Sequence, residues 1–255
     1  MIYINGDSWS RNLWTERSPE DWCWAKQLSD KINQPILNQS AGCGSNSRAV
    51  DMLTRCYTQD KKFDLVLIGL TTPMRWHLPA KTESNWSIGP TVINDRVYKH
   101  DETILKWWRV NSLNTLEYTF QYYNHIWKMH EFCSTYYKCP VVFFNAWDND
   151  MYTLHKKFIN DSSYISTWCQ EQLGELHFDY SFFNYVQSFE FFVRKSQDWF
   201  LEMQPWSDLL SAGDYDGPND KDPRHPSKIG HKKIADFVLA TIKSLVPNTY
   251  NKLIT

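Results

Sequence analysis

Short apolar runs alternate along this chain with longer segments in which apolar side chains recur every three or four residues. The runs predict buried strands at about residues 2–4, 35–38, 64–69 and 140–145, with a fifth near 176–179. Continuous apolar runs of this length are typical of parallel strands that are covered on both faces.

The segments with helical periodicity predict helices at about residues 19–32, from 46 onward, 112–137, 181–196 and 227–245. The first begins with a capping serine, a proline and two acids, in the order that favours a helix start. Alternating strands and helices imply an α/β fold in which helices cover both faces of a parallel sheet. We therefore expect a single domain over residues 1–255.

Residues 77–111 interrupt this alternation and predict an insertion of loops with a hairpin at 91–98. Aromatic residues are abundant in the chain, with 13 tryptophans, 14 tyrosines and 14 phenylalanines. Most aromatic side chains build the core of a protein. The indoles of Trp86, Trp107 and Trp108 lie in or near the insertion, however, and we expect them to contact substrate there; local packing is the alternative.

Charge and cysteine content exclude several classes of protein. The net charge of −2 comes with dispersed basic residues, so we expect no nucleic-acid partner. The six cysteines show no paired zinc spacing, and free thiols are the simplest interpretation. His225 and His231 lack a third ligand with metal-site spacing, so we expect neither a metal nor another cofactor.

The start of the chain runs directly into a strand, without a basic flank or an apolar signal region. No apolar stretch approaches the roughly 20 residues of a membrane span, so we expect no membrane partner. The expected location is the cytoplasm in which the protein is made, with a host cytoplasm or a virion as later destinations.

Candidate chemistry is concentrated at the two ends of the chain. Ser8 follows the first strand in a Gly-Asp-Ser turn, and Asp222 and His225 form an Asp-x-x-His pair before the last helix. A serine hydroxyl needs a base to become nucleophilic, and the base needs a carboxylate to fix its tautomer. These residue types predict a triad, in which Ser8 attacks, His225 is the base and Asp222 orients it.

Small residues follow the second and third strands as well. Gly42 and Gly44 lie in the segment after residue 38, and Thr71 follows the strand at 64–69. Ligands of open α/β sheets bind beyond the carboxyl ends of the strands, where backbone N–H groups could stabilise an oxyanion. We expect the hole to use the N–H of Ser8, the N–H of Gly42 or Gly44, and the Thr71 hydroxyl.

Together these motifs resemble those of the SGNH hydrolases, also called GDSL esterases and lipases. Ser8 matches the first block, Gly42 or Gly44 the second, and Asp222 with His225 the fifth; the likeness covers about the first 75 and last 40 residues. The third block departs from the family's Gly-x-Asn-Asp, because Thr71 takes the asparagine position. The run from Thr71 to Trp76 is similar to that of phage-encoded members.

The resemblance implies a flavodoxin-like three-layer sandwich with a central parallel sheet of about five strands and an aromatic-rich insertion. It also implies a serine esterase, and the tryptophans favour a small acyl group, such as acetyl, on a glycan. Two alternatives stay open. One is a non-catalytic structural or receptor-binding component of a viral particle, with other particle proteins as partners; the other is a lipid esterase.

Overall fold

The computed structural model covers the whole chain and describes the residues of the core and of both termini. The described residues are 1–11, 23–42, 44–73, 75–78, 86–88, 115–145, 154–155, 157–158, 160–176, 206–211, 214 and 225–255. The hairpin expected at 91–98, the helix expected at 181–196 and Asp222 lie outside them, as do Trp107 and Trp108.

A parallel sheet forms the centre of the molecule, in the order β2-β1-β3-β6. Its described strands are β1 (Ile2–Asn5), β2 (Ile36–Asn38), β3 (Leu65–Leu70) and β6 (Val141–Asn145). Ile4 is paired with Asn38 on one side and with Leu67 on the other, so the strands end close to one line. This order is that of flavodoxin-like folds, and the predicted α/β sandwich is confirmed. Among the described residues the sheet has these four strands, where about five were predicted.

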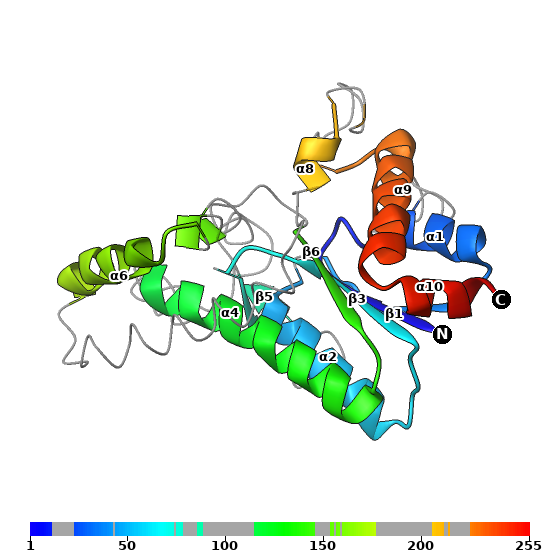
Figure 1. The fold of residues 1–255 in the computed structure, drawn as a ribbon, viewed down its shortest axis with the longest axis horizontal. Helices are drawn as coiled ribbons and strands as arrows, with labels where there is room; N and C mark the ends of the chain where they lie inside the picture. The colour runs from blue at the N-terminus through cyan, green and yellow to red at the C-terminus, as the bar shows by residue number, and fades with distance from the viewer. Residues whose placement is uncertain are drawn as a thin grey trace.

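Helices cover both faces of the sheet, as Figure 1 shows. One face packs against α2 (Asn46–Thr58) and α4 (Thr115–Phe132), and the other against α1 (Trp24–Ile32) and α9 (Lys228–Leu245). The remaining described helices are the π-helical turn η2 (Cys133–Tyr137), α6 (Ser162–Leu176), α8 (Trp206–Leu209) and α10 (Pro247–Ile254).

Alternate side chains of each strand enter different cores. On β3, Val66 and Ile68 pack toward α2 and α4, whereas Leu65 and Leu67 pack toward α1 and α9. A strand exposes successive side chains on opposite faces, so a strand buried on both sides must be apolar throughout. This is why the third strand could be recognised as a continuous apolar run.

The structure corrects two expectations and adds elements that the sequence had not predicted. Leu176 ends α6, so the strand predicted to begin there does not; Ile165 and Cys169 are buried one helical turn apart. The stretch containing Trp86, expected to be irregular, includes an antiparallel pair of strands, β4 (Trp76–Leu78) and β5 (Trp86–Ile88). Helices α6, α8 and α10 had not been predicted.

Candidate active site

Ser8 lies in a tight turn directly after β1, which we call the serine turn (residues 6–11). The carbonyl of Asp7 accepts from the N–H groups of Ser10 (3.1 Å) and Arg11 (3.2 Å), and its Oδ1 accepts from Trp9 N–H (3.0 Å). The Asp7 side chain thus closes one helical turn in the manner of a helix cap. Ser8 is 9% exposed, and neither its N–H nor its Oγ bonds to another described residue.

The glycine loop (residues 39–42 and 44) follows β2 and packs against the serine turn. Ala41 N–H donates to Gly6 O (3.1 Å), and Gly44 N–H donates to Ala41 O (3.0 Å). A Cβ on Gly44 would lie 2.5 Å from Gly6 O, so close packing explains the glycine there. The N–H of Gly42 makes no hydrogen bond to any described residue. The N–H of Gly44 is therefore already hydrogen-bonded, whereas that of Gly42 is available to a ligand.

The threonine turn (residues 71–73 and 75) follows β3. Asn46, in the first turn of α2, holds it in both directions: Asn46 Nδ2 donates to Thr71 O (2.9 Å), and Thr71 N–H donates to Asn46 Oδ1 (3.0 Å). Thr71 is 1% exposed, and its Oγ1 finds no hydrogen-bond partner among the described residues. A buried hydroxyl without a partner is costly in a folded protein and calls for an explanation.

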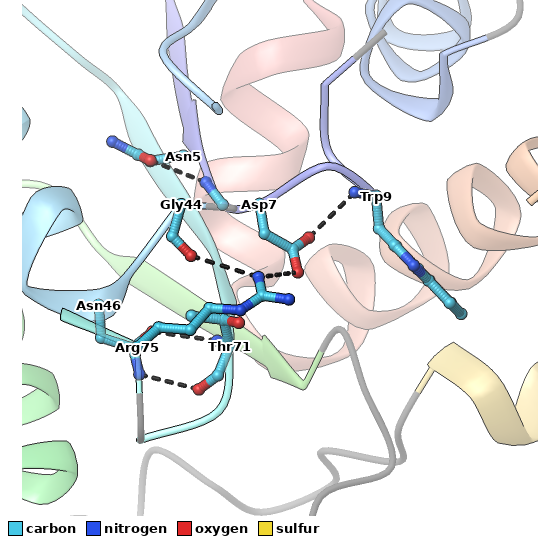
Figure 2. Close-up of polar contacts among 8 residues, drawn as sticks. Asn5, Asp7, Trp9, Gly44, Asn46, Thr71 and Arg75 are labelled. Carbon is cyan, nitrogen blue, oxygen red and sulfur yellow. Dashed lines mark hydrogen bonds and ion pairs between the residues drawn. The ribbon is translucent and has the colours of Figure 1, made fainter. Parts of the chain in front are cut away.

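Arg75 connects all three of these segments, as Figure 2 shows. Its N–H donates to Thr72 O (3.3 Å) within the threonine turn, and its Nη1 donates to Asp7 Oδ2 (3.0 Å) and, at 3.5 Å, to Gly44 O. The side chains of this ion pair are 5% and 0% exposed. A charged pair buried so completely needs good geometry to offset the cost of removing both ions from water.

A second buried arginine fixes the ends of the neighbouring strands. Arg48, on α2, donates to Gln39 O (2.7 Å) and, at 3.5 Å, to Asn5 Oδ1. Burial lowers the pKa of this guanidinium. Asn5 Oδ1 also accepts from Gly6 N–H (2.8 Å), so Arg48 acts on the start of the serine turn.

His225 lies two residues before Ser227, the residue that caps α9 by accepting from Gly230 N–H. His231 lies in the first turns of α9 and is buried close to His225. Burial, and secondly the neighbouring His225, lower the pKa of His231 to about 4, so His231 is neutral at pH 7. The sequence predicted His231 on the last helix as a surface or packing residue, and the structure shows it buried there.

Asp214 fixes the segment before α9. Its carbonyl accepts from Ser227 N–H (2.7 Å), and its carboxylate accepts from Ser211 N–H (2.7 Å) and pairs with Lys233. The Lys233 ammonium, followed by the Ser211 N–H, lowers the pKa of the Asp214 carboxyl.

The structure places Ser8, Gly42, Gly44 and Thr71 at the carboxyl ends of three adjacent strands, β1, β2 and β3. Ser8 Oγ makes no hydrogen bond to a described residue, His225 included. Asp222, Trp107 and Trp108 lie outside the described residues, and of Trp86 only the backbone is described. The roles assigned to these residues stay predictions.

Reasoning from the sequence missed the residues that hold the turns, namely Asp7, Asn46, Arg48 and Arg75. One signal was present, because Arg75 closes a turn after a wholly apolar strand. A guanidinium at such a place is rarely buried unless it meets a carboxylate. Asp7 is 68 residues away, however, and no local pattern relates the two.

The described residues hold neither a cluster of metal ligands nor a membrane-spanning helix. In the part of the chain that the structure describes, no three histidine, cysteine or acidic side chains are grouped so that they could hold a metal ion. None of the helices in that part is both long and apolar enough to cross a membrane.

Comparison with known proteins gives likeness of structure without a match in sequence. No family model matches the chain, and no curated protein matches it. Solved structures that resemble it include that of TesA, with 12% identity, a TM-score of 0.49 and coverage of 96% of this chain and 99% of that one. The esterase EstA from Pseudoalteromonas sp. is 14% identical, with a TM-score of 0.49 and coverage of 97% of this chain and 98% of that one. A member of the lipolytic G-D-S-L family from Veillonella parvula is 12% identical, with a TM-score of 0.48 and coverage of 95% of this chain and 98% of that one. At these values the likeness does not extend to activity.

Proposed function

We propose that this protein is a serine ester hydrolase of the SGNH kind. One observation carries the proposal: Ser8 lies in a turn at the carboxyl edge of the sheet, where the N–H groups of Ser8 and Gly42 are both without a hydrogen bond to a described residue. Ser8 is buried, and buried backbone N–H groups are rarely left without a partner in a folded protein. Donors kept uncommitted beside a candidate nucleophile suit a developing oxyanion.

In the proposed reaction Ser8 Oγ attacks the ester carbonyl while His225 takes its proton. The tetrahedral intermediate collapses with loss of the alcohol, which receives that proton from His225. Water then attacks the acyl-enzyme by the same route, releasing the acid and restoring Ser8. Asp222 holds His225 in the required tautomer. A hydrogen bond between Ser8 and His225 need not be formed before substrate binds, because catalytic hydrogen bonds often tighten only in the complex.

The proposed oxyanion hole consists of Ser8 N–H, Gly42 N–H and the Thr71 hydroxyl. Gly42 is preferred to Gly44, because Gly44 N–H already donates to Ala41 O. Thr71 Oγ1 is buried and has no described partner, as expected of a donor whose acceptor arrives with the substrate. Thr71 N–H is held by Asn46 and is not available.

The proposed substrate carries a small acyl group, such as acetyl, on a glycan. The support for this is compositional: tryptophan side chains suit the apolar faces of sugar rings, and Trp86, Trp107 and Trp108 are candidates for that contact. Alanine at these positions should raise KM for an acetylated glycan and leave hydrolysis of p-nitrophenyl acetate unchanged, because uniform binding is lost while the chemistry is kept. Equal losses on both substrates with a lower melting temperature would indicate packing.

A fluorophosphonate probe tests the assignment directly. Purified protein should be labelled at Ser8, as located by mass spectrometry, and should hydrolyse p-nitrophenyl acetate. Labelling should disappear in Ser8→Ala and fall strongly in His225→Ala, because an unassisted hydroxyl is a weak nucleophile. Ser134→Ala is the matched control, since Ser134 is exposed and lies on η2, directly after the C-terminal end of α4.

The outcomes separate the alternatives. Labelling at another serine contradicts the assignment of Ser8. Folded protein that is neither labelled nor active would favour a structural or receptor-binding role. A rate that rises from acetate to octanoate esters would favour a lipid esterase.

A further inference from the structure

Arg75 is the one described side chain that touches both the serine turn and the glycine loop while belonging to the threonine turn. We propose that Arg75 is a positioning residue, which holds the Ser8 and Gly42 N–H groups at the spacing that an oxyanion requires. The proposal rests on the proposed function and assigns a role to a residue that the triad does not include.

The two oxygens of the Asp7 carboxylate have different partners. Its Oδ1 accepts from Trp9 N–H and so closes the turn that carries Ser8. Its Oδ2 accepts from Arg75 Nη1 at 3.0 Å. The direction of the Ser8 N–H therefore depends on a carboxylate whose other oxygen is held from outside the turn.

Arg75 also contacts the glycine loop. The same Nη1 approaches Gly44 O at 3.5 Å, and Gly44 N–H closes a turn onto Ala41 O that has Gly42 within it. One guanidinium nitrogen thus fixes both turns from which the proposed donors come. Figure 2 shows Arg75 between Gly44 and Asp7.

The planar shape of the guanidinium suits this double contact. A guanidinium presents several donors in a fixed fork, whereas an ammonium is a compact point charge on a flexible stem. Arg75→Lys keeps a positive charge beside Asp7, so we expect it to fold, but it cannot hold both turns in the same fixed geometry. Charge and positioning can therefore be separated by experiment.

The experiment begins with wild-type protein, which must hydrolyse p-nitrophenyl acetate and react with the fluorophosphonate at Ser8. Failure here overturns the proposed function, and the role of Arg75 with it. If the wild type is active, Arg75→Lys and the double variant Asp7→Asn/Arg75→Met are compared with it. The double variant removes both charges, so neither is left buried without its partner.

We expect kcat to fall at least about tenfold in Arg75→Lys and about 100-fold in the double variant, because misplacing reacting groups by about 1 Å can cost that much. KM for the small ester should change little. A boronic acid, which forms a tetrahedral adduct with Ser8, should lose affinity by a similar factor. The pH midpoint of the acid limb of kcat/KM should stay unchanged, because His225 is not affected.

Arg55→Met is the matched control, since Arg55 lies exposed on α2 in a pair with Asp51. All assays are run well below each variant's melting temperature, so that the protein is folded. Wild-type kcat and boronate affinity in folded Arg75→Lys would overturn the proposal. So would a shifted pH midpoint with kcat unchanged at its plateau, because that would place the effect of Arg75 on His225.

Discussion

Thr71 carries a hydroxyl that is buried and has no described partner, as do Ser10 in the serine turn and Ser40 in the glycine loop. Replacing such a group by a methyl of the same shape is nearly neutral or stabilising when the group has no function. The Thr71→Val substitution therefore gives opposite results under the two interpretations. A hydroxyl that donates to the oxyanion is needed for turnover, and one that only closes the turn is not.

We predict that Thr71→Val lowers kcat by about 10²–10³ with little change in KM, the usual cost of one oxyanion donor. Thr71→Ser, which keeps the hydroxyl, should retain most of the activity. Steady-state kinetics on p-nitrophenyl acetate and a urea denaturation curve for each variant make the test. A folded Thr71→Val with less than about a threefold loss of kcat would leave the oxyanion hole to the backbone alone.

Gly44 differs from Gly42 in that its role is fixed by packing. A methyl at Gly44 would lie 2.5 Å from a backbone oxygen, Gly6 O, which cannot move without moving the serine turn. Gly44→Ala should lower the free energy of unfolding by about 1–3 kcal/mol, the usual cost of overpacking. Urea denaturation measures it, and an unchanged midpoint would mean that the glycine loop can shift away from β1.

At the scale of elements, contacts with Asp214 fix the position of the start of α9. A Cβ on Gly230 would lie 2.3 Å from Asp214 O, and that carbonyl accepts from the N–H of Ser227, the cap of the helix. The segment with His225 is therefore held against the start of α9 by backbone contacts. A change at Gly230 should be felt at His225 without any change to its ring.

We predict that Gly230→Ala destabilises the protein by about 1–3 kcal/mol, although alanine favours helix over glycine by about 1 kcal/mol. It should also slow fluorophosphonate labelling of Ser8, because His225 is displaced. Lys232→Ala, exposed on the same turn of α9, is the control and should do neither. Greater stability in Gly230→Ala would show that Asp214 moves freely.

The elements that the sequence predicted well are those whose signal is local. Each strand of the parallel sheet contains a continuous apolar run. On α4 the periodicity predicted one apolar face, of which Leu116, Tyr123 and Ile126 are buried and Phe120 and Trp127 half-buried. Helix α6 was missed although Ile165, Trp168 and Cys169 recur at helical spacing and pack into or against the core. The ion pair of Asp7 and Arg75 was missed because it exists only after β1 and β3 have paired.

At the scale of the whole molecule, the order of the strands explains why the candidate residues converge. Strands β2, β1 and β3 are neighbours and run parallel, so the segments after them meet at one edge of the sheet, although they are far apart in sequence. The alternation of strands and helices was enough to predict this edge. The distances between the candidate residues at this edge depend on contacts between buried side chains. The sequence alone does not show which of these side chains meet.

Buried histidines on several elements make the stability of the whole molecule depend on pH. Burial lowers the pKa of His155 and His231 to about 4, and that of His125 on α4 to a similar value. His155 also bonds to Tyr123 through Nδ1 (2.7 Å). An unfolded histidine has a pKa of about 6.5, so above that pH both states are neutral and this stability is fully present.

As the pH falls from about 6.5 to about 4, the unfolded chain binds protons that the folded chain does not. We therefore predict that the free energy of unfolding falls with pH in this window, by at most about 4 kcal/mol per pH unit from His125, His155 and His231 together. Urea denaturation between about pH 7 and pH 5 measures it, and His231→Gln should remove about a third of the slope. Asp214 and Asp64, whose pKa values are lowered, lose stability only near and below the ordinary carboxyl pKa of 3.8, so the windows are distinct. An unfolding midpoint independent of pH between about 7 and 5 would mean that these imidazoles accept protons while the protein stays folded.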